Sequence, residues 1–147
     1  MWAQTSCVPS TLSVAGPIPN RLIWTQIRHA TTALRLDAGK TESSYGDVAE
    51  NRLNGIEVAG TAAATITGVR IVRNPNGAGL VVSGDAKPIL RRNTFAENGW
   101  AILNQTPYSL DARENWWGTR TPSDELFVGA VDWSQPLQAE PAETGGR

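Results

Sequence analysis

The chain has 147 residues, which is enough for one domain with its own core and too few for two ordinary domains. Thirteen basic and fourteen acidic residues leave a formal net charge of -1, which excludes the strongly basic surface of a typical nucleic-acid-binding protein. With 14 glycines, nine prolines and 18% charged residues, the composition favours a turn-rich β protein over long amphipathic helices.

The first segment, residues 1–21, contains no complete repeat and is expected to form a flank or a partial cap. It lacks the positive start and apolar run of a secretory signal, and no stretch of the chain is apolar enough to predict membrane insertion. Cys7 is the single cysteine, so no internal disulfide is possible, and the absence of Cys or His at ligand spacing predicts a thiol that is structural or has no role. An unsealed first coil would pair with a second copy of the chain or with further coils of a longer protein.

A repeat of about 22 residues runs from residue 22 to residue 118. Each period carries three short apolar centres with period-2 alternation, which is typical of short strands. Because stacked strands lie about 4.8 Å apart, like residues then form interior columns. The sequence therefore predicts an all-β fold, a right-handed parallel β-helix of four to five coils. The first column is Ile27, Val48, Ile71 and Phe95; the second is Leu34, Ile56, Leu80 and Ile102; the third is Ile66, Ile89 and Leu110, with its earlier member near Tyr45.

An asparagine follows the first apolar centre by three residues in three of the periods. These residues are Asn51, Asn74 and Asn98, with Ala30 at the same place in the first coil. Stacked asparagines bond to one another and to backbone groups, and asparagine tolerates the left-handed conformation that a sharp corner requires. We therefore interpret them as a structural ladder at a corner.

The repeat ends at Asn115-Trp116-Trp117-Gly118. The last coil of a β-helix exposes apolar side chains and unpaired strand groups, and bulky aromatic residues can cover both. Trp116 and Trp117 are therefore predicted to cap the helix, with a sugar-stacking platform as the alternative. Residues 119–137 are expected to complete the cap, and residues 138–147 to form a disordered tail.

The pattern of an apolar residue, polar residues, Asn and then Gly-hydrophobic-x-Val resembles the repeats of the pectate-lyase-like superfamily. The segments 111–118 and 131–137 are similar to the last coil and trailing strand of bacterial right-handed β-helix repeat proteins. This resemblance spans about 115 residues. It implies an extracellular or cell-surface protein whose partner is a polysaccharide or a cell-surface glycan. It does not select an activity, because the superfamily contains lyases, hydrolases, epimerases, adhesins and proteins without known activity.

Enzymes of this superfamily are expected to carry clustered acids, a basic residue and sometimes calcium on one outward face. The outward columns here alternate in charge instead, which favours a solvated face with modest ion pairs. Two of them are His29, Glu50, Arg73, Glu97 and Gln26, Asp47, Arg70, Thr94. A third column, Arg35, Glu57, Val81 and Leu103, has too few acids for calcium, so neither a metal nor another cofactor is predicted. His29, the sole histidine, has no nucleophile motif near it.

We therefore expect a non-catalytic β-helix module, structural or in contact with a glycan or a surface. The alternative is a polysaccharide lyase or glycoside hydrolase that acts on the outer face of the helix. The candidate glycan-facing residues for both hypotheses are Arg35, Glu57, Asp47, Arg70, Lys87 and Arg91.

Overall fold

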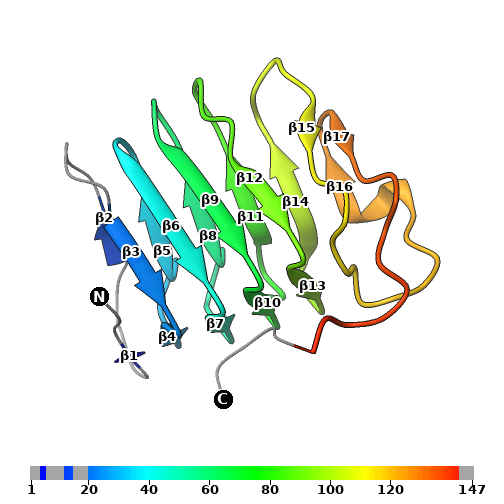
Figure 1. The fold of residues 1–147 in the computed structure, drawn as a ribbon, viewed down its shortest axis with the longest axis horizontal. Helices are drawn as coiled ribbons and strands as arrows, with labels where there is room; N and C mark the ends of the chain where they lie inside the picture. The colour runs from blue at the N-terminus through cyan, green and yellow to red at the C-terminus, as the bar shows by residue number, and fades with distance from the viewer. Residues whose placement is uncertain (1–3, 6–11, 15–19, 143–147) are drawn as a thin grey trace.

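The structure is a computed structural model that describes residues 4–5, 12–14 and 20–142. Its coils stack into a parallel β-helix of about five turns, which confirms the predicted fold class (Figure 1). The described residues include one short 3₁₀ helix, η1 (Asp124–Leu126), and no helix among them is long and apolar enough to cross a membrane. Cys7, most of the predicted N-terminal flank and residues 143–147 of the predicted tail lie outside the described residues.

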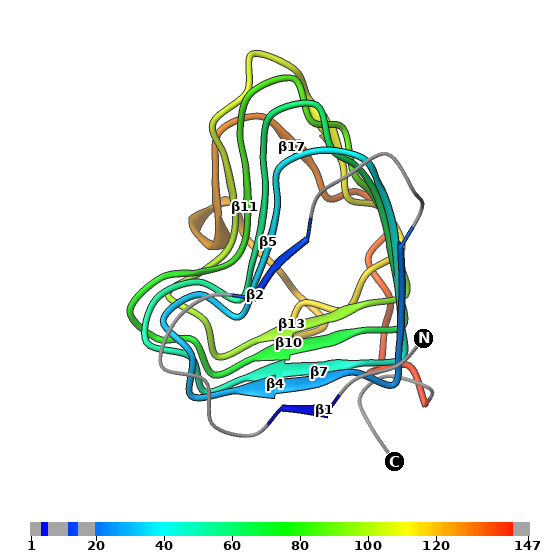
Figure 2. The ribbon, with the colours of Figure 1, turned by 90° about the vertical axis from the view of Figure 1, so that its left-hand side faces the viewer.

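Each of the first four coils contributes one strand to each of three parallel sheets, which enclose the core when viewed along the helix axis (Figure 2). Sheet A contains β1 (Gln4–Thr5), β4 (Gln26–Arg28), β7 (Asp47–Ala49), β10 (Arg70–Val72) and β13 (Thr94–Ala96). Sheet B contains β2 (Leu12–Val14), β5 (Leu34–Leu36), β8 (Ile56–Val58), β11 (Ala78–Val82), β14 (Trp100–Asn104) and β16 (Phe127–Val128). Sheet C contains β3 (Asn20–Ile23), β6 (Lys40–Ser44), β9 (Ala63–Thr67) and β12 (Ile89–Arg91). A short sheet D pairs β15 (Leu110–Asp111) with β17 (Val131–Asp132).

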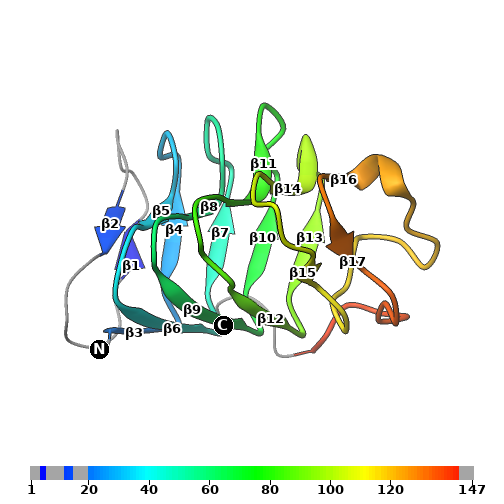
Figure 3. The ribbon, with the colours of Figure 1, turned by 90° about the horizontal axis from the view of Figure 1, so that it is seen from above.

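The strand register confirms the first two apolar columns. Ile27, Val48, Ile71 and Phe95 are paired in sequence along sheet A, and Leu34, Ile56, Leu80 and Ile102 along sheet B. All eight side chains are buried. The strand pairing of sheet B also extends beyond the predicted repeat, because Leu12 pairs with Leu34 and Phe127 pairs with Ile102. Figure 3 shows the strands of each sheet side by side along the axis.

The predicted third column is wrong at two positions. Ile66 pairs with Leu90, which is fully buried, whereas Ile89 points outward and is 54% exposed. Adjacent residues of a strand face opposite sides of the sheet, so the sequence pattern is satisfied with either Ile89 or Leu90 in the core. Only the strand register decides which of the two is the interior residue. In the preceding coil the interior position is the buried Ser43, not Tyr45. A small polar residue leaves no apolar signal in the sequence.

The left-handed corner between sheets A and B is also one residue earlier than predicted. The positive φ angles belong to the residues that precede the asparagine positions, at 61° for His29, 57° for Glu50, 55° for Arg73 and 56° for Glu97. These residues accept a conformation that costs roughly 1–2 kcal/mol. The asparagines occupy the next position, where their side chains bond along the helix axis.

Two asparagine ladders bind successive coils together. In the first, the Oδ1 atom of Asn98 accepts hydrogen bonds from the N and Nδ2 atoms of Asn74 at 3.1 and 2.8 Å, and Asn74 binds Asn51 in the same way. The second ladder lies at the corner between sheets C and A. There the Oδ1 atom of Asn115 accepts from the N and Nδ2 atoms of Asn93 at 3.0 and 3.2 Å. Each ladder satisfies buried corner groups that would otherwise lack partners.

The C-terminal end of the core is closed by aromatic residues. Trp117 is 3% exposed and stacks on Phe95 with ring centroids 5.1 Å apart. Its other contact is edge-on to Phe127 at 4.8 Å, and Phe127 stacks on Trp133 at 5.7 Å. Because Trp117 is covered on both sides, it contributes packing to the end of the core and has no free face on which a sugar could stack.

The segment after Trp133 returns toward the outward face of sheet A (Figure 1). The Leu137 backbone N–H donates to the Asn115 carbonyl at 3.0 Å, and Glu140 Oε1 lies 3.1 Å from Arg70 Nε. Pro141 is buried. Residues 137–141 therefore pack against the helix and extend back to β10.

Candidate functional site

The six candidate residues lie on three different faces of the helix. Arg35 and Glu57 are paired on adjacent strands of sheet B, and Asp47 and Arg70 on adjacent strands of sheet A. Lys87 precedes β12 and Arg91 ends it, at sheet C. They do not form one site. The sequence columns paired Arg35 with Glu57 and Asp47 with Arg70 correctly, but a residue's position around the axis decides which residues share a face.

The sheet B pair forms an exposed ion-pair network. Arg35 Nη1 lies 2.8 Å from Glu57 Oε2, and Arg35 Nε lies 2.9 Å from Asp37 Oδ1. The two carboxylates, first Asp37 and then Glu57, raise the pKa of Arg35. Exposed ion pairs of this kind contribute little to stability, and their charged groups do not supply a proton for acid–base catalysis. This face has the character of a solvated β-helix surface.

Asp47, the acid of the sheet A pair, is buried. The Asp47 side chain is 3% exposed; Arg28 Nη2 donates to its Oδ2 atom, and Arg70 Nη1 lies 3.6 Å from Oδ1. Arg70 in turn pairs with Glu140 of the returning C-terminal segment. A buried carboxylate requires compensation of this kind, because an unpaired buried charge is costly. Asp47 therefore presents no free surface to a ligand.

Lys87 lies in a cleft of about 310 Å³ between the start of β12 and the loop that precedes β15. Its Nζ atom lies 4.3 Å from the centroid of the Tyr108 ring, within the range of a cation–π contact. Tyr108 is 43% exposed. We call this hollow the Lys87 cleft; its lining residues are Ala86, Lys87, Pro88, Ile89, Thr106, Tyr108, Ser109, Leu110 and Asp111.

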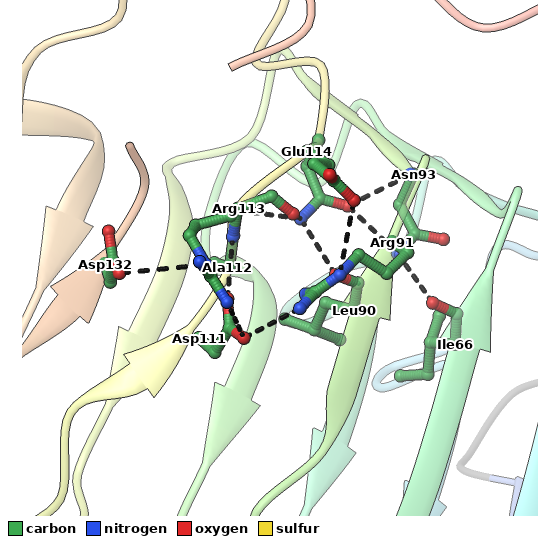
Figure 4. Close-up of polar contacts among 10 residues, drawn as sticks. Ile66, Leu90, Arg91, Asn93, Asp111, Ala112, Arg113, Glu114 and Asp132 are labelled. Atoms are coloured by element: carbon green, nitrogen blue, oxygen red, sulfur yellow. Dashed lines mark hydrogen bonds and ion pairs between the residues drawn. The ribbon is translucent and has the colours of Figure 1, made fainter. Parts of the chain in front are cut away.

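Asp111 joins the Lys87 cleft to a cluster of ion pairs (Figure 4). Arg113 Nε lies 3.0 Å from Asp111 Oδ1, and Arg91 Nη2 lies 2.7 Å from Asp111 Oδ2. Arg113, and after it Arg91, hold the pKa of Asp111 well below its ordinary value. Arg91 also lies 3.5 Å from Glu114, and Arg113 lies 3.9 Å from Asp132. Asp111 is therefore a fixed carboxylate anion with both oxygens engaged.

A second hollow, of about 540 Å³, lies at the corner between sheets A and B. We call it the corner pocket; it is lined by Glu50, Asn51, Arg73, Pro75 and Glu97. Arg73 Nη2 donates to Glu50 Oε1 at 2.9 Å and lowers the pKa of Glu50. None of the described residues that line the pocket is aromatic, and they include two carboxylates and one guanidinium.

Sequence reasoning missed Tyr108 and Asp111. Tyr108 is one of ten Trp, Tyr and Phe residues and falls outside every apolar column, which is the signal that marks it as a surface residue. Asp111 was grouped with the closing motif, and its partners lie 20 residues earlier, at Arg91, and two residues later, at Arg113. In the part of the chain that the structure describes, no group of three or more His, Cys, Asp or Glu residues is placed to hold a metal ion.

No protein-family model, curated protein sequence or solved structure matches the chain.

Proposed function

We propose that this chain is a non-catalytic β-helix module that contacts a glycan through the Lys87 cleft. The repeat and the Asn-Trp-Trp-Gly end support a place among the β-helix repeat proteins of the pectate-lyase-like superfamily, at the cell surface or outside the cell. The single observation that carries the binding proposal is the exposed Tyr108 ring beside Lys87 in a cleft of about 310 Å³.

The lining of the Lys87 cleft matches the chemistry of a saccharide. Tyr108 and Ile89 offer exposed apolar surface to the C–H groups of a sugar ring. Lys87 offers donors, and the Ser109 hydroxyl offers a donor and an acceptor, for the hydroxyl groups of a sugar. Small-molecule sites commonly combine apolar walls with a few polar groups that fix orientation.

The charge state of Asp111 supports binding rather than catalysis. Among the described residues that line the Lys87 cleft it is the one carboxylate, and its two arginine partners keep it ionised. A general acid must carry a proton at the working pH, and a carboxylate with a lowered pKa carries none there. Glycoside hydrolysis also needs a second carboxyl group across the scissile bond.

Titration calorimetry with a panel of neutral and acidic oligosaccharides tests this proposal. Tyr108→Ala removes the ring but keeps the backbone carbonyl that accepts from Asn104 Nδ2, so the fold is retained. It is expected to weaken binding of the recognised saccharide about five- to tenfold, as loss of an aromatic contact does. Trp100→Ala is the matched control, because Trp100 is 44% exposed and does not line the cleft. Equal binding by wild type and Tyr108→Ala would reject this site, and release of reducing ends or unsaturated products would reject the non-catalytic assignment.

A glycoside hydrolase remains the second candidate because two carboxylates line the corner pocket. Glu50 and Glu97 lie two coils apart, with Arg73 on the coil between them. Two strand spacings amount to about 9.6 Å, close to the upper end of the carboxyl separation of inverting hydrolases. If this candidate is correct, Glu50→Gln and Glu97→Gln each abolish a measured hydrolysis while the melting temperature stays near that of wild type.

A further inference from the structure

The chain contains three Asn-Gly dipeptides, and all three lie in the turns that join sheet A to sheet B. They are Asn54-Gly55, Asn76-Gly77 and Asn98-Gly99. An asparagine side chain is open to attack by the backbone nitrogen of the next residue. Glycine permits this reaction best, because it has no side chain to obstruct the approach and adopts a wide range of backbone angles. The same attack by a glycine nitrogen on an asparagine side chain is therefore available at three turns, which differ in their surroundings.

Two of the asparagine side chains are held by hydrogen bonds. Asn54 Nδ2 donates to Glu57 Oε1 at 2.8 Å, and Asn54 Oδ1 accepts from the Ala78 backbone at 2.9 Å. Asn98 Oδ1 accepts from two nitrogen atoms of Asn74, and Asn98 Nδ2 donates to the Ile71 carbonyl at 3.0 Å. Either side chain must break these bonds before its carbonyl carbon can meet the next backbone nitrogen.

Asn76 differs from both. Its side chain is exposed and forms no hydrogen bond to any residue that the structure describes. The Gly77 N–H donates to the Asn74 carbonyl at 3.3 Å, which is longer than the corresponding bonds of Gly55 at 3.0 Å and Gly99 at 3.1 Å. Longer hydrogen bonds are weaker, so the Gly77 nitrogen is the least restrained of the three. We propose that Asn76 is a site of spontaneous deamidation in the folded protein.

In this reaction the Gly77 nitrogen attacks the Asn76 side-chain carbonyl carbon and loses its proton. The carbon–nitrogen bond of the carboxamide breaks, ammonia leaves and a five-membered succinimide remains. Water then opens the ring at either carbonyl, which gives aspartate or isoaspartate. The net change is the addition of one water and the release of one ammonia, with no oxidation or reduction.

The product alters the corner between sheets A and B in two ways. A new carboxylate appears next to Pro75, which lines the corner pocket together with Glu50 and Glu97. An isoaspartyl link also adds a methylene to the main chain just before Gly77, whose carbonyl accepts from the Trp100 N–H at 3.0 Å. That carbonyl packs so closely against Gly99 that a Cβ there would clash. The isoaspartate form therefore disturbs the turn of the next coil.

The test is peptide mapping by mass spectrometry of the full chain, incubated at mildly alkaline pH, with a parallel sample in denaturant. In the folded protein the Asn76 peptide is expected to react about tenfold or more faster than the Asn54 and Asn98 peptides, a factor that corresponds to about 1.4 kcal/mol of local opening. In denaturant the three peptides are expected to react at similar rates. Fragmentation that separates aspartate from isoaspartate identifies the product.

Asn76→Gln is the matched control, since glutamine keeps the amide but cyclises poorly, and it is expected to remove the early product entirely. The proposal is overturned if Asn54 or Asn98 reacts first in the folded protein. It is also overturned if Asn76 reacts only in denaturant.

Discussion

The Oδ1 atom of Asn74 accepts two hydrogen bonds from Asn51 on the preceding coil, one from the backbone N–H at 3.0 Å and one from Nδ2 at 2.9 Å. The Nδ2 atom of Asn74 donates in turn to the Val72 carbonyl and to Asn98 Oδ1. One carboxamide therefore satisfies the corner of its own coil and that of a neighbour, and no other side chain combines the donors and acceptors in this geometry.

Asn74→Ala is expected to lower the free energy of unfolding by about 3 kcal/mol or more, because it leaves buried groups of Asn51 without partners. Urea titration followed by circular dichroism measures the change. Asn76→Ala is the control, because Asn76 is exposed and lies two residues later in the same turn; it is expected to stay within about 0.5 kcal/mol of wild type. Equal stability of the two variants would show that the ladder is not a stabilising element.

Trp117→Ala is expected to lower the free energy of unfolding by about 3–5 kcal/mol, since it opens a cavity between Phe95 and Phe127 at the end of the core. Thermal and urea unfolding report the loss. Trp100→Ala removes a tryptophan of which 44% is already exposed and is expected to cost much less. If both substitutions cost the same, Trp117 is not the residue that closes the helix.

Glu97 adopts a φ of 56°, so Glu97→Gly and Glu97→Val are expected to differ in their effect on stability. Glycine accepts this angle without strain, and after its own entropic cost the stability is expected to be unchanged or up to about 1 kcal/mol higher. Valine is β-branched and is expected to lower stability by about 1 kcal/mol or more. A stable valine variant would contradict the left-handed corner.

Asp111 is expected to make stability depend on acid pH. Arg113 and Arg91 lower its folded-state pKa, so the folded state binds a proton less readily than the unfolded state, whose pKa is about 3.9. The stabilisation that this pKa difference gives the folded state is complete above about pH 5 and is lost as the pH falls through the acidic range toward the folded-state pKa.

Asp111→Asn is therefore expected to be less stable than wild type at neutral pH, and the difference in stability is expected to disappear in acid. Urea titrations at several pH values measure it; a difference independent of pH would exclude this linkage. High salt is expected to reduce the effect, because the Asp111 side chain is 44% exposed.

The parallel β-helix was predictable because its signal is cooperative along the chain: Val48, Ile71 and Phe95 identify a column that none of them identifies alone. The two wrong positions of the third column lie where the interior residue is polar, or where the interior position is shifted by one residue. Ser43 is buried without being apolar, and Ile89 is apolar without being buried. Whether such a residue is buried depends on its register with the neighbouring strand, which the sequence of one coil does not determine.

The candidate site was harder to predict, because a glycan-facing surface depends on position around the helix axis. Lys87 was singled out for its charge, but its partner Tyr108 belongs to the loop of the following coil. Asp47 was treated as a surface acid, whereas its side chain is 3% exposed and paired with Arg28 and Arg70. The tail contact with Arg70 joins residues 70 positions apart, and no local pattern predicts it.

That contact also bears on how the molecule unfolds. In a stack of repeats each coil contacts only its neighbours, so the stack can unfold from one end, one coil at a time. Here Leu137 is bonded to Asn115 in the last coil, while Glu140 reaches Arg70 on β10. Unfolding of the final coil therefore also breaks an ion pair to β10 in the middle of the helix, which couples the last coil to a strand that is not its neighbour.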